Sequence, residues 1–179
     1  IWGCAERDAV VGRGASWPRC YGGVLGRLAR RSSREAVRLA EDMAHKAHSM
    51  LSPAIPGDCC SPSYDRWCGQ LRAAGVPLID MDSDGCVEEL IPIWIESGIN
   101  VCDPIEVAAH NDIRVYREAY GKQIAFRQGI DKRAIAKGGE AIRAEMKRIE
   151  PVVRDGGYIP GCDHGVPSDI SWAAFVDYG

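Results

Sequence analysis

The chain of 179 residues is 46% hydrophobic and 26% charged, which is ordinary for a globular domain with a buried core. Its formal net charge of −3 argues against a nucleic-acid partner, and no apolar run approaches the roughly 18 residues of a membrane span. The eight cysteines include no Cys-x-x-Cys pair, and a chain of this size does not need disulfides. We therefore expect reduced thiols, a cytoplasmic location and no membrane partner.

Residues 1–33 are rich in Gly and Arg and show little periodicity, so they form an unassigned lead segment before the organised part at 34–179. The next stretch has two interpretations. Apolar residues recur at helical spacing from 36 to 51, which favours a helix. Alternatively, 36–40 is a short strand that ends at Glu41 and Asp42.

Helices and strands are predicted to alternate from residue 64 onward. The predicted helices are Tyr64–Ala74, Val87–Ser97, Asp112–Tyr120, Lys132–Val153 (divided at Gly138 and Gly139) and Ser168–Tyr178. The predicted strands are Pro77–Met81, Ile99–Cys102, Gln123–Phe126 and Gly157–Pro160. This alternation predicts a parallel α/β sheet covered by helices.

The spacing of the predicted strands favours a (β/α)8 barrel of the TIM type. Successive strands begin near 77, 99, 123 and 157, close to the roughly 30 residues of a barrel unit. A doubly wound open sheet is the alternative. It lacks its marker here, because no Gly-x-Gly-x-x-Gly follows a strand.

Polar residues follow every predicted strand. They are Asp82 and Asp84 after the first, Asp103 and Glu106 after the second, Asp131 and Lys132 after the third, and Asp163 and His164 after the fourth. Because the strand ends of a barrel meet at one mouth, where active sites lie, these residues predict a small-molecule site there.

The acids Asp82 and Asp84 lie on the same side of an extended chain. Two such carboxylates can bind a metal, or can divide into a proton donor and a proton acceptor. Alternatively, one of them caps the helix that begins near Val87. His164 stands between glycines in a tight loop, which suits either a functional imidazole or a structural hydrogen bond.

Asp131 and Lys132 also have two interpretations. Asp131 can cap the helix that follows, with Lys132 among the solvated charges of its first turn. Alternatively, both residues contact substrate.

Four stretches of the chain resemble the C-terminal half of the uroporphyrinogen decarboxylase superfamily. They are Leu78–Gly85 (LIDMDSDG), Pro104–Ala109 (PIEVAA), Gly129–Arg133 (GIDKR) and Gly156–Pro167 (GGYIPGCDHGVP). Glu41–Met43 and Ser52–Pro53 resemble its middle. The resemblance covers roughly 35–179 and implies a partial barrel with about strands 4 to 8. It also favours the strand at 36–40, with Glu41 and Asp42 facing the mouth.

The first activity that the resemblance implies is a carboxy-lyase that decarboxylates a tetrapyrrole, in porphyrin biosynthesis, without a cofactor. His164, Asp82 and Asp84 would be its catalytic residues. Substrate contacts would come from Glu41, Asp42, Glu106, Asp131 and Lys132.

The second implied activity is a corrinoid-linked methyltransferase with a divalent metal at Asp82, Asp84 and His164. Sister enzymes bind zinc through His-x-Cys-Gly, where this chain has Asp82-Ser83-Asp84-Gly85, so the site here would be oxygen-rich. The third alternative is an inactive fragment that needs its missing half. In the full-length form we expect a homodimer.

Overall fold

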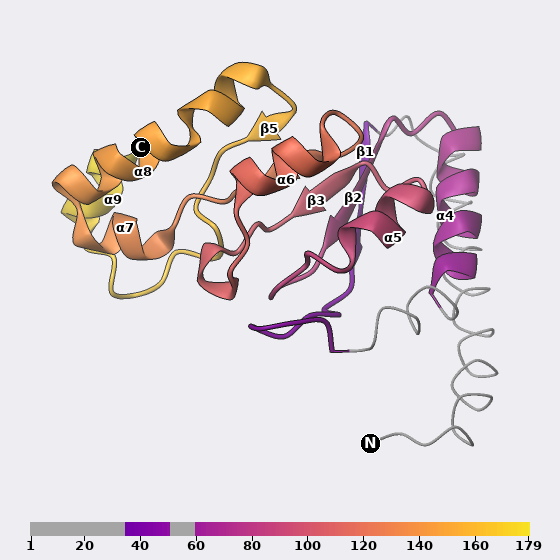
Figure 1. Cartoon of the computed structure of the whole chain (residues 1–179), viewed down its shortest axis with the longest axis horizontal. Coiled ribbons are helices and arrows are strands. Elements are labelled where there is room, and N and C mark those ends of the chain that lie inside the picture. Colours follow the sequence, from indigo (N-terminus) through magenta and orange to yellow (C-terminus); the bar gives the residue numbers. More distant parts are fainter. Residues whose placement is uncertain (1–34, 51–59) are drawn as a thin grey trace.

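The structure is a computed structural model that describes residues 35–50 and 60–179. The lead segment 1–33 and the motif Ser52–Pro53 lie outside the described residues. Five parallel strands form one sheet in chain order: β1 (Ala36–Ala40), β2 (Leu78–Asp82), β3 (Val101–Asp103), β4 (Ala125–Arg127) and β5 (Tyr158–Ile159) (Figure 1). Each strand pairs in parallel with the next one along the chain.

Helices connect the strands, so the predicted α/β alternation is confirmed. The connecting elements are α4 (Ser61–Ala73), α5 (Ile91–Glu96), the 3-10 turn η1 (Val107–Ala109), α6 (Ile113–Tyr120), α7 (Lys132–Lys137) and α8 (Gly139–Asp155), and α9 (Trp172–Tyr178) follows the last strand. The predicted break between α7 and α8 falls at Gly138, whose φ of 71° glycine adopts readily. This arrangement is consistent with part of a TIM-type barrel.

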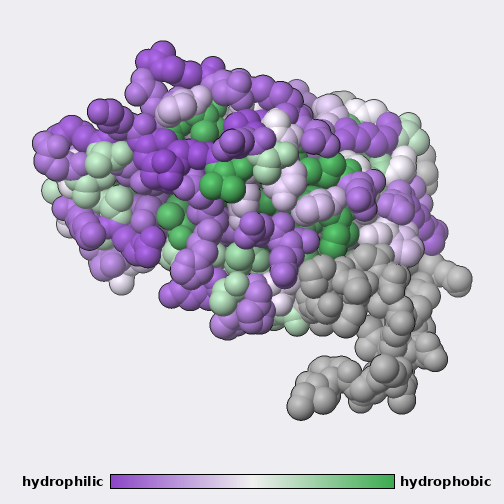
Figure 2. All heavy atoms as spheres, viewed as in Figure 1, coloured by the Kyte–Doolittle hydropathy of each residue, from purple (hydrophilic) through white to green (hydrophobic). Residues whose placement is uncertain are grey.

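The two faces of the sheet differ in chemistry because side chains alternate along each strand. One face carries a row of paired apolar residues that is buried: Leu39, Met81, Cys102, Phe126 and Tyr158. Tyr116 of α6 packs on Phe126, with the two ring centroids 6.1 Å apart. Viewed as in Figure 1, the molecule is mainly hydrophilic, with hydrophobic residues gathered in the middle of the view (Figure 2).

The stretch 36–40 is strand β1, so the helical interpretation is wrong and the strand interpretation is confirmed. Pairing with β2 decides the conformation, since Leu39 lies opposite Met81 and both are buried. Residues 41–50 form a short hairpin, in which the His45 N–H donates to the His48 carbonyl at 2.8 Å. Tertiary pairing has overridden a helical spacing of apolar residues.

Helix α5 is shorter than the predicted helix Val87–Ser97, since it begins only at Ile91. Pro92 is its second residue. A proline ring clashes with the carbonyl four residues earlier in a continuous helix, which explains why the helix does not extend back to Val87.

The thiols of Cys68, Cys86 and Cys102 are buried and reduced, as the cysteine spacing predicts. Within 35–50 and 60–179, no helix is both long and apolar enough to cross a bilayer.

Candidate functional site

The carboxyl ends of β2 and β5 bring Asp84 and His164 together. His164 Nε2 lies 3.4 Å from Asp84 Oδ2. The backbone N–H of Asp84 donates to Asp42 Oδ1 at 3.4 Å, which adds the loop after β1. Three strand ends thus contribute polar groups to one rim.

Glu106 and Lys132 extend this rim to the ends of β3 and β4. Lys132 Nζ donates to Glu106 Oε1 at 3.1 Å, and the Gly85 N–H donates to Glu106 Oε2 at 3.2 Å. We call Asp42, Asp84, Glu106, Lys132 and His164 the rim site. It unites five of the residues that the sequence predicts for the site.

Two of the three acids of the rim site, Asp84 and Glu106, have pKa shifts in opposite directions. Burial raises the pKa of Asp84, although His164 opposes this shift. Burial alone would also raise the pKa of Glu106, but the hydrogen bonds from Lys132 and Gly85 outweigh it and lower that pKa. Relative to their ordinary values, the pKa of Asp84 is therefore shifted toward holding a proton, and that of Glu106 toward staying ionised.

Asp82 lies in a second polar group, on the sheet face opposite the apolar row. Arg38 Nη2 lies 2.9 Å from Asp82 Oδ1 and 2.6 Å from Asp103 Oδ2. Arg127 Nη1 donates to Asp80 Oδ2 at 2.6 Å. We call Arg38, Asp80, Asp82, Asp103 and Arg127 the inner row. The sequence places Asp82 and Asp84 at one site, but in the structure their partners differ. Asp82 pairs with Arg38, and Asp84 contacts His164.

The inner row contains buried acids with incomplete hydrogen bonding. Asp103 is fully buried, and its Oδ1 atom has no hydrogen-bond partner. Burial raises the pKa of Asp103 and of Asp80, and the nearby guanidinium groups oppose the shift. The arginines, which are themselves partly exposed, therefore offset the cost of burying the Asp80 and Asp103 carboxylates.

The predicted metal ligands do not form a three-ligand centre in the described parts of the chain. Asp84 and His164 meet, but the Asp82 carboxylate is engaged by Arg38. No group of three or more His, Cys, Asp and Glu side chains within 35–50 and 60–179 is arranged to hold an ion. This donor arrangement does not fit a divalent metal at Asp82, Asp84 and His164.

Two further predicted substrate contacts have local structural partners. Asp131 caps α7, since it accepts from the Arg133 N–H at 2.9 Å, as one of its two interpretations predicts. Glu41 is half-buried, and burial raises the pKa of its carboxyl. Burial, followed by the charge of Glu41, raises the pKa of Tyr64 on α4, so Glu41 lies near that ring.

Asn111 is a buried residue of the site that sequence reasoning missed. Its Oδ1 accepts from the Val87 N–H at 3.1 Å and from the Tyr116 hydroxyl at 2.6 Å. Its Nδ2 donates to the carbonyls of Gly85 and Glu106, at 2.8 and 2.9 Å. Asn111 thus ties the loop of Asp84 to the loop of Glu106. Nothing in the local sequence distinguishes it from an ordinary loop asparagine.

A separate open groove of about 780 Å³ lies along α8, lined by Ile130, Arg143, Met146, Lys147, Ile149, Glu150, Val153, Pro160, Tyr178 and Gly179. It contains no residue of the rim site or of the inner row. The groove therefore occupies a different place from the polar side chains at the strand ends.

Comparisons with known proteins identify the fold. No family model and no curated protein sequence matches the chain. Among solved structures, a methyltransferase from Methanosarcina mazei is similar, with a TM-score of 0.60 and 13% sequence identity. The match covers 88% of this chain and 46% of that one, so the chain spans about half the length of its structural neighbour. At this identity the likeness shows a shared α/β fold.

Proposed function

We propose that the chain is part of an enzyme that transfers a methyl group between small molecules, with the Asp84–His164 pair as its proton-exchanging group. The 3.4 Å contact between these side chains, at the carboxyl ends of β2 and β5, carries the proposal. Enzymes built from parallel β/α units place their reacting groups at these strand ends. The fold shared with a methyltransferase gives the reaction class by analogy alone.

In the proposed reaction, an acceptor with an acidic X–H group attacks the methyl carbon of a donor. A bond forms between X and the methyl carbon, and the bond to the donor breaks with its electron pair remaining on the donor. The X–H proton passes to the Asp84 carboxylate, which His164 holds through Nε2. Because burial raises the pKa of Asp84, its carboxylate is a stronger base than an exposed one.

Glu106 and Lys132 would bind the substrate at the same rim. Lys132 neutralises Glu106 at 3.1 Å, so Glu106 adds no unpaired negative charge beside Asp84. Asp42 would contact polar groups of the substrate from the loop after β1.

Decarboxylation without a cofactor is the second candidate, and the arrangement of donor groups favours it. The Asp82 carboxylate pairs with Arg38 and not with Asp84 and His164, so the described residues offer a proton-exchanging pair in place of a three-ligand metal centre. In this reaction the Asp84–His164 pair would donate a proton instead of accepting one. The bond between the substrate carbon and its carboxylate would break, carbon dioxide would leave, and the electron pair left on the carbon would take the proton.

One experiment separates the two candidates. The chain is incubated with methylcobalamin and a small thiol, and in parallel with uroporphyrinogen, while the corrinoid spectrum and released carbon dioxide are followed. Methyl transfer that Asp84→Asn abolishes and the exposed control Asp65→Asn preserves would support the first candidate. Carbon dioxide release with the same dependence would support the second. Without either activity, the remaining proposal is that the fragment needs the other half of a barrel.

A further inference from the structure

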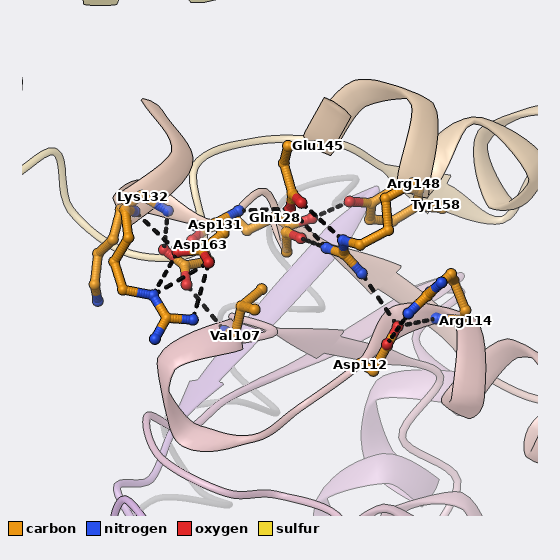
Figure 3. Close-up of polar contacts among 12 residues, drawn as sticks. Val107, Asp112, Arg114, Gln128, Asp131, Lys132, Glu145, Arg148, Tyr158 and Asp163 are labelled. Carbon is orange, nitrogen blue, oxygen red and sulfur yellow. Dashed lines mark hydrogen bonds and ion pairs between the residues drawn. The ribbon is translucent and has the colours of Figure 1, made fainter. Parts of the chain in front are cut away.

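We propose that Asp163 is the positioning residue of the rim site, because its buried carboxylate fixes the three loops that carry Glu106, Lys132 and His164. Its Oδ2 accepts from the Val107 N–H at 2.9 Å, and its Oδ1 accepts from the Lys132 N–H at 3.2 Å. Figure 3 shows the carboxylate between these two loops. This inference rests on the proposed function for its catalytic meaning, but its geometry stands alone.

Both hydrogen bonds satisfy groups that helices leave without partners. Val107 is the first residue of η1, and Lys132 is the first residue of α7. The first N–H groups of a helix have no acceptor within it. One side chain, from the loop after β5, therefore caps the two elements that follow β3 and β4.

Each group that Asp163 holds is at or next to a residue of the rim site. Val107 directly follows Glu106, Lys132 is itself in the rim, and His164 directly follows Asp163. The Asp163 N–H also donates to the Ile130 carbonyl at 2.8 Å, which fixes its own backbone. A shift of this carboxylate therefore moves both the Lys132–Glu106 contact and the His164–Asp84 contact.

The geometry requires a carboxylate at this position. Two backbone N–H donors approach from different loops, one to each oxygen. Asparagine has nearly the same shape, but its amide NH2 would face one of these donors and leave that N–H without an acceptor. The side chain is fully buried, so water cannot readily replace the lost bond.

Hydrogen exchange and imidazole spectra test the proposal without requiring turnover. In the unmodified chain, the amide protons of Val107 and Lys132 should exchange slowly, although helix starts normally leave such protons unprotected. In Asp163→Asn at least one of them should lose protection. The ¹H–¹⁵N imidazole signals of His164 should then move in the direction that Asp84→Asn moves them.

Asp112→Asn is the matched control, because Asp112 also accepts a backbone N–H at a helix start, from Arg114 of α6 at 2.9 Å, and lies outside the rim site. It should leave the His164 signals unchanged. Fast exchange of both amides in the unmodified chain would overturn the proposal, even if Asp163→Asn fails to fold. Equal shifts of the His164 signals in Asp163→Asn and Asp112→Asn would also overturn the proposal. With an assay in hand, Asp163→Asn should lower kcat about 10- to 100-fold with little change in KM.

Discussion

The Arg38 guanidinium on β1 reaches across β2 to lie 2.6 Å from the buried carboxylate of Asp103 on β3. The only other cation that pairs with Asp103 in the described residues is Arg127, at the longer distance of 3.4 Å. The inner row therefore depends on a residue of β1, the stretch for which the sequence pattern allows either a strand or a helix.

Replacing Arg38 by Met should destabilise the fold by about 2 kcal/mol at neutral pH, because it leaves a buried carboxylate without its nearer partner. Burial already raises the pKa of Asp103 and Arg38 opposes this shift, so the substitution raises that pKa further. As the pH falls through the new value, Asp103 becomes neutral and the destabilisation should shrink. Denaturant unfolding at several pH values measures it.

The control for this prediction is Arg154→Met, which removes a surface pair with Glu150. That change should alter the unfolding free energy by less than about 0.5 kcal/mol, without the same pH trend. A constant loss in Arg38→Met at every pH would contradict the assigned charge state of Asp103.

His164→Asn should lower turnover roughly 100-fold or more while changing the unfolding free energy by less than about 0.5 kcal/mol. The side chain is exposed, so its removal costs little packing, but the contact with Asp84 is lost. Steady-state kinetics and thermal unfolding measure the two effects. His110→Asn is the control, since His110 is also exposed and asparagine tolerates its φ of 68°. Unchanged turnover in His164→Asn would refute the catalytic assignment.

Asn111→Ala should destabilise the fold by at least about 3 kcal/mol, because it removes partners from several buried groups at once. It should also lower turnover, since it releases the loops of Asp84 and Glu106 from each other. Asn100→Ala provides the comparison. Asn100 links Ile79 and Pro77 at the amino-terminal ends of the strands, whereas the rim lies at their carboxyl ends. That variant should lose stability in urea titrations but keep its kcat, and a parallel loss of kcat would count against the role of Asn111.

Gly85→Ala should cost about 3 kcal/mol of unfolding free energy. A Cβ at this position would lie 2.7 Å from the Ala44 carbonyl oxygen, and the φ of 86° is itself unfavourable for alanine. Gly75→Ala isolates the backbone contribution, since Gly75 has a φ of 81° and open space around it. It should cost only about 1 kcal/mol. Equal losses of unfolding free energy in Gly85→Ala and Gly75→Ala would mean that the hairpin 41–50 moves away from the added Cβ without a free-energy cost.

The residues of the rim were identifiable before the fold because their signal is local. Asp84, Glu106, Lys132 and His164 each follow a predicted strand within a few residues, and parallel strands bring such ends to one edge. The different surroundings of Asp82 and Asp84 do not follow from any local signal in the sequence. They arise because β1 pairs with β2 in a register that sets Arg38 beside Asp82.

The sequence by itself determined the alternation of strands and helices, since apolar periodicity and the placement of Gly and Pro act over a few residues. Tertiary structure alone decided that 36–40 is a strand, that Asn111 joins two loops and that Asp163 caps two helix starts. The physical reason is that these features depend on hydrogen bonds between segments far apart in the chain. No pattern within a single segment encodes which distant N–H group a buried carboxylate or amide will meet.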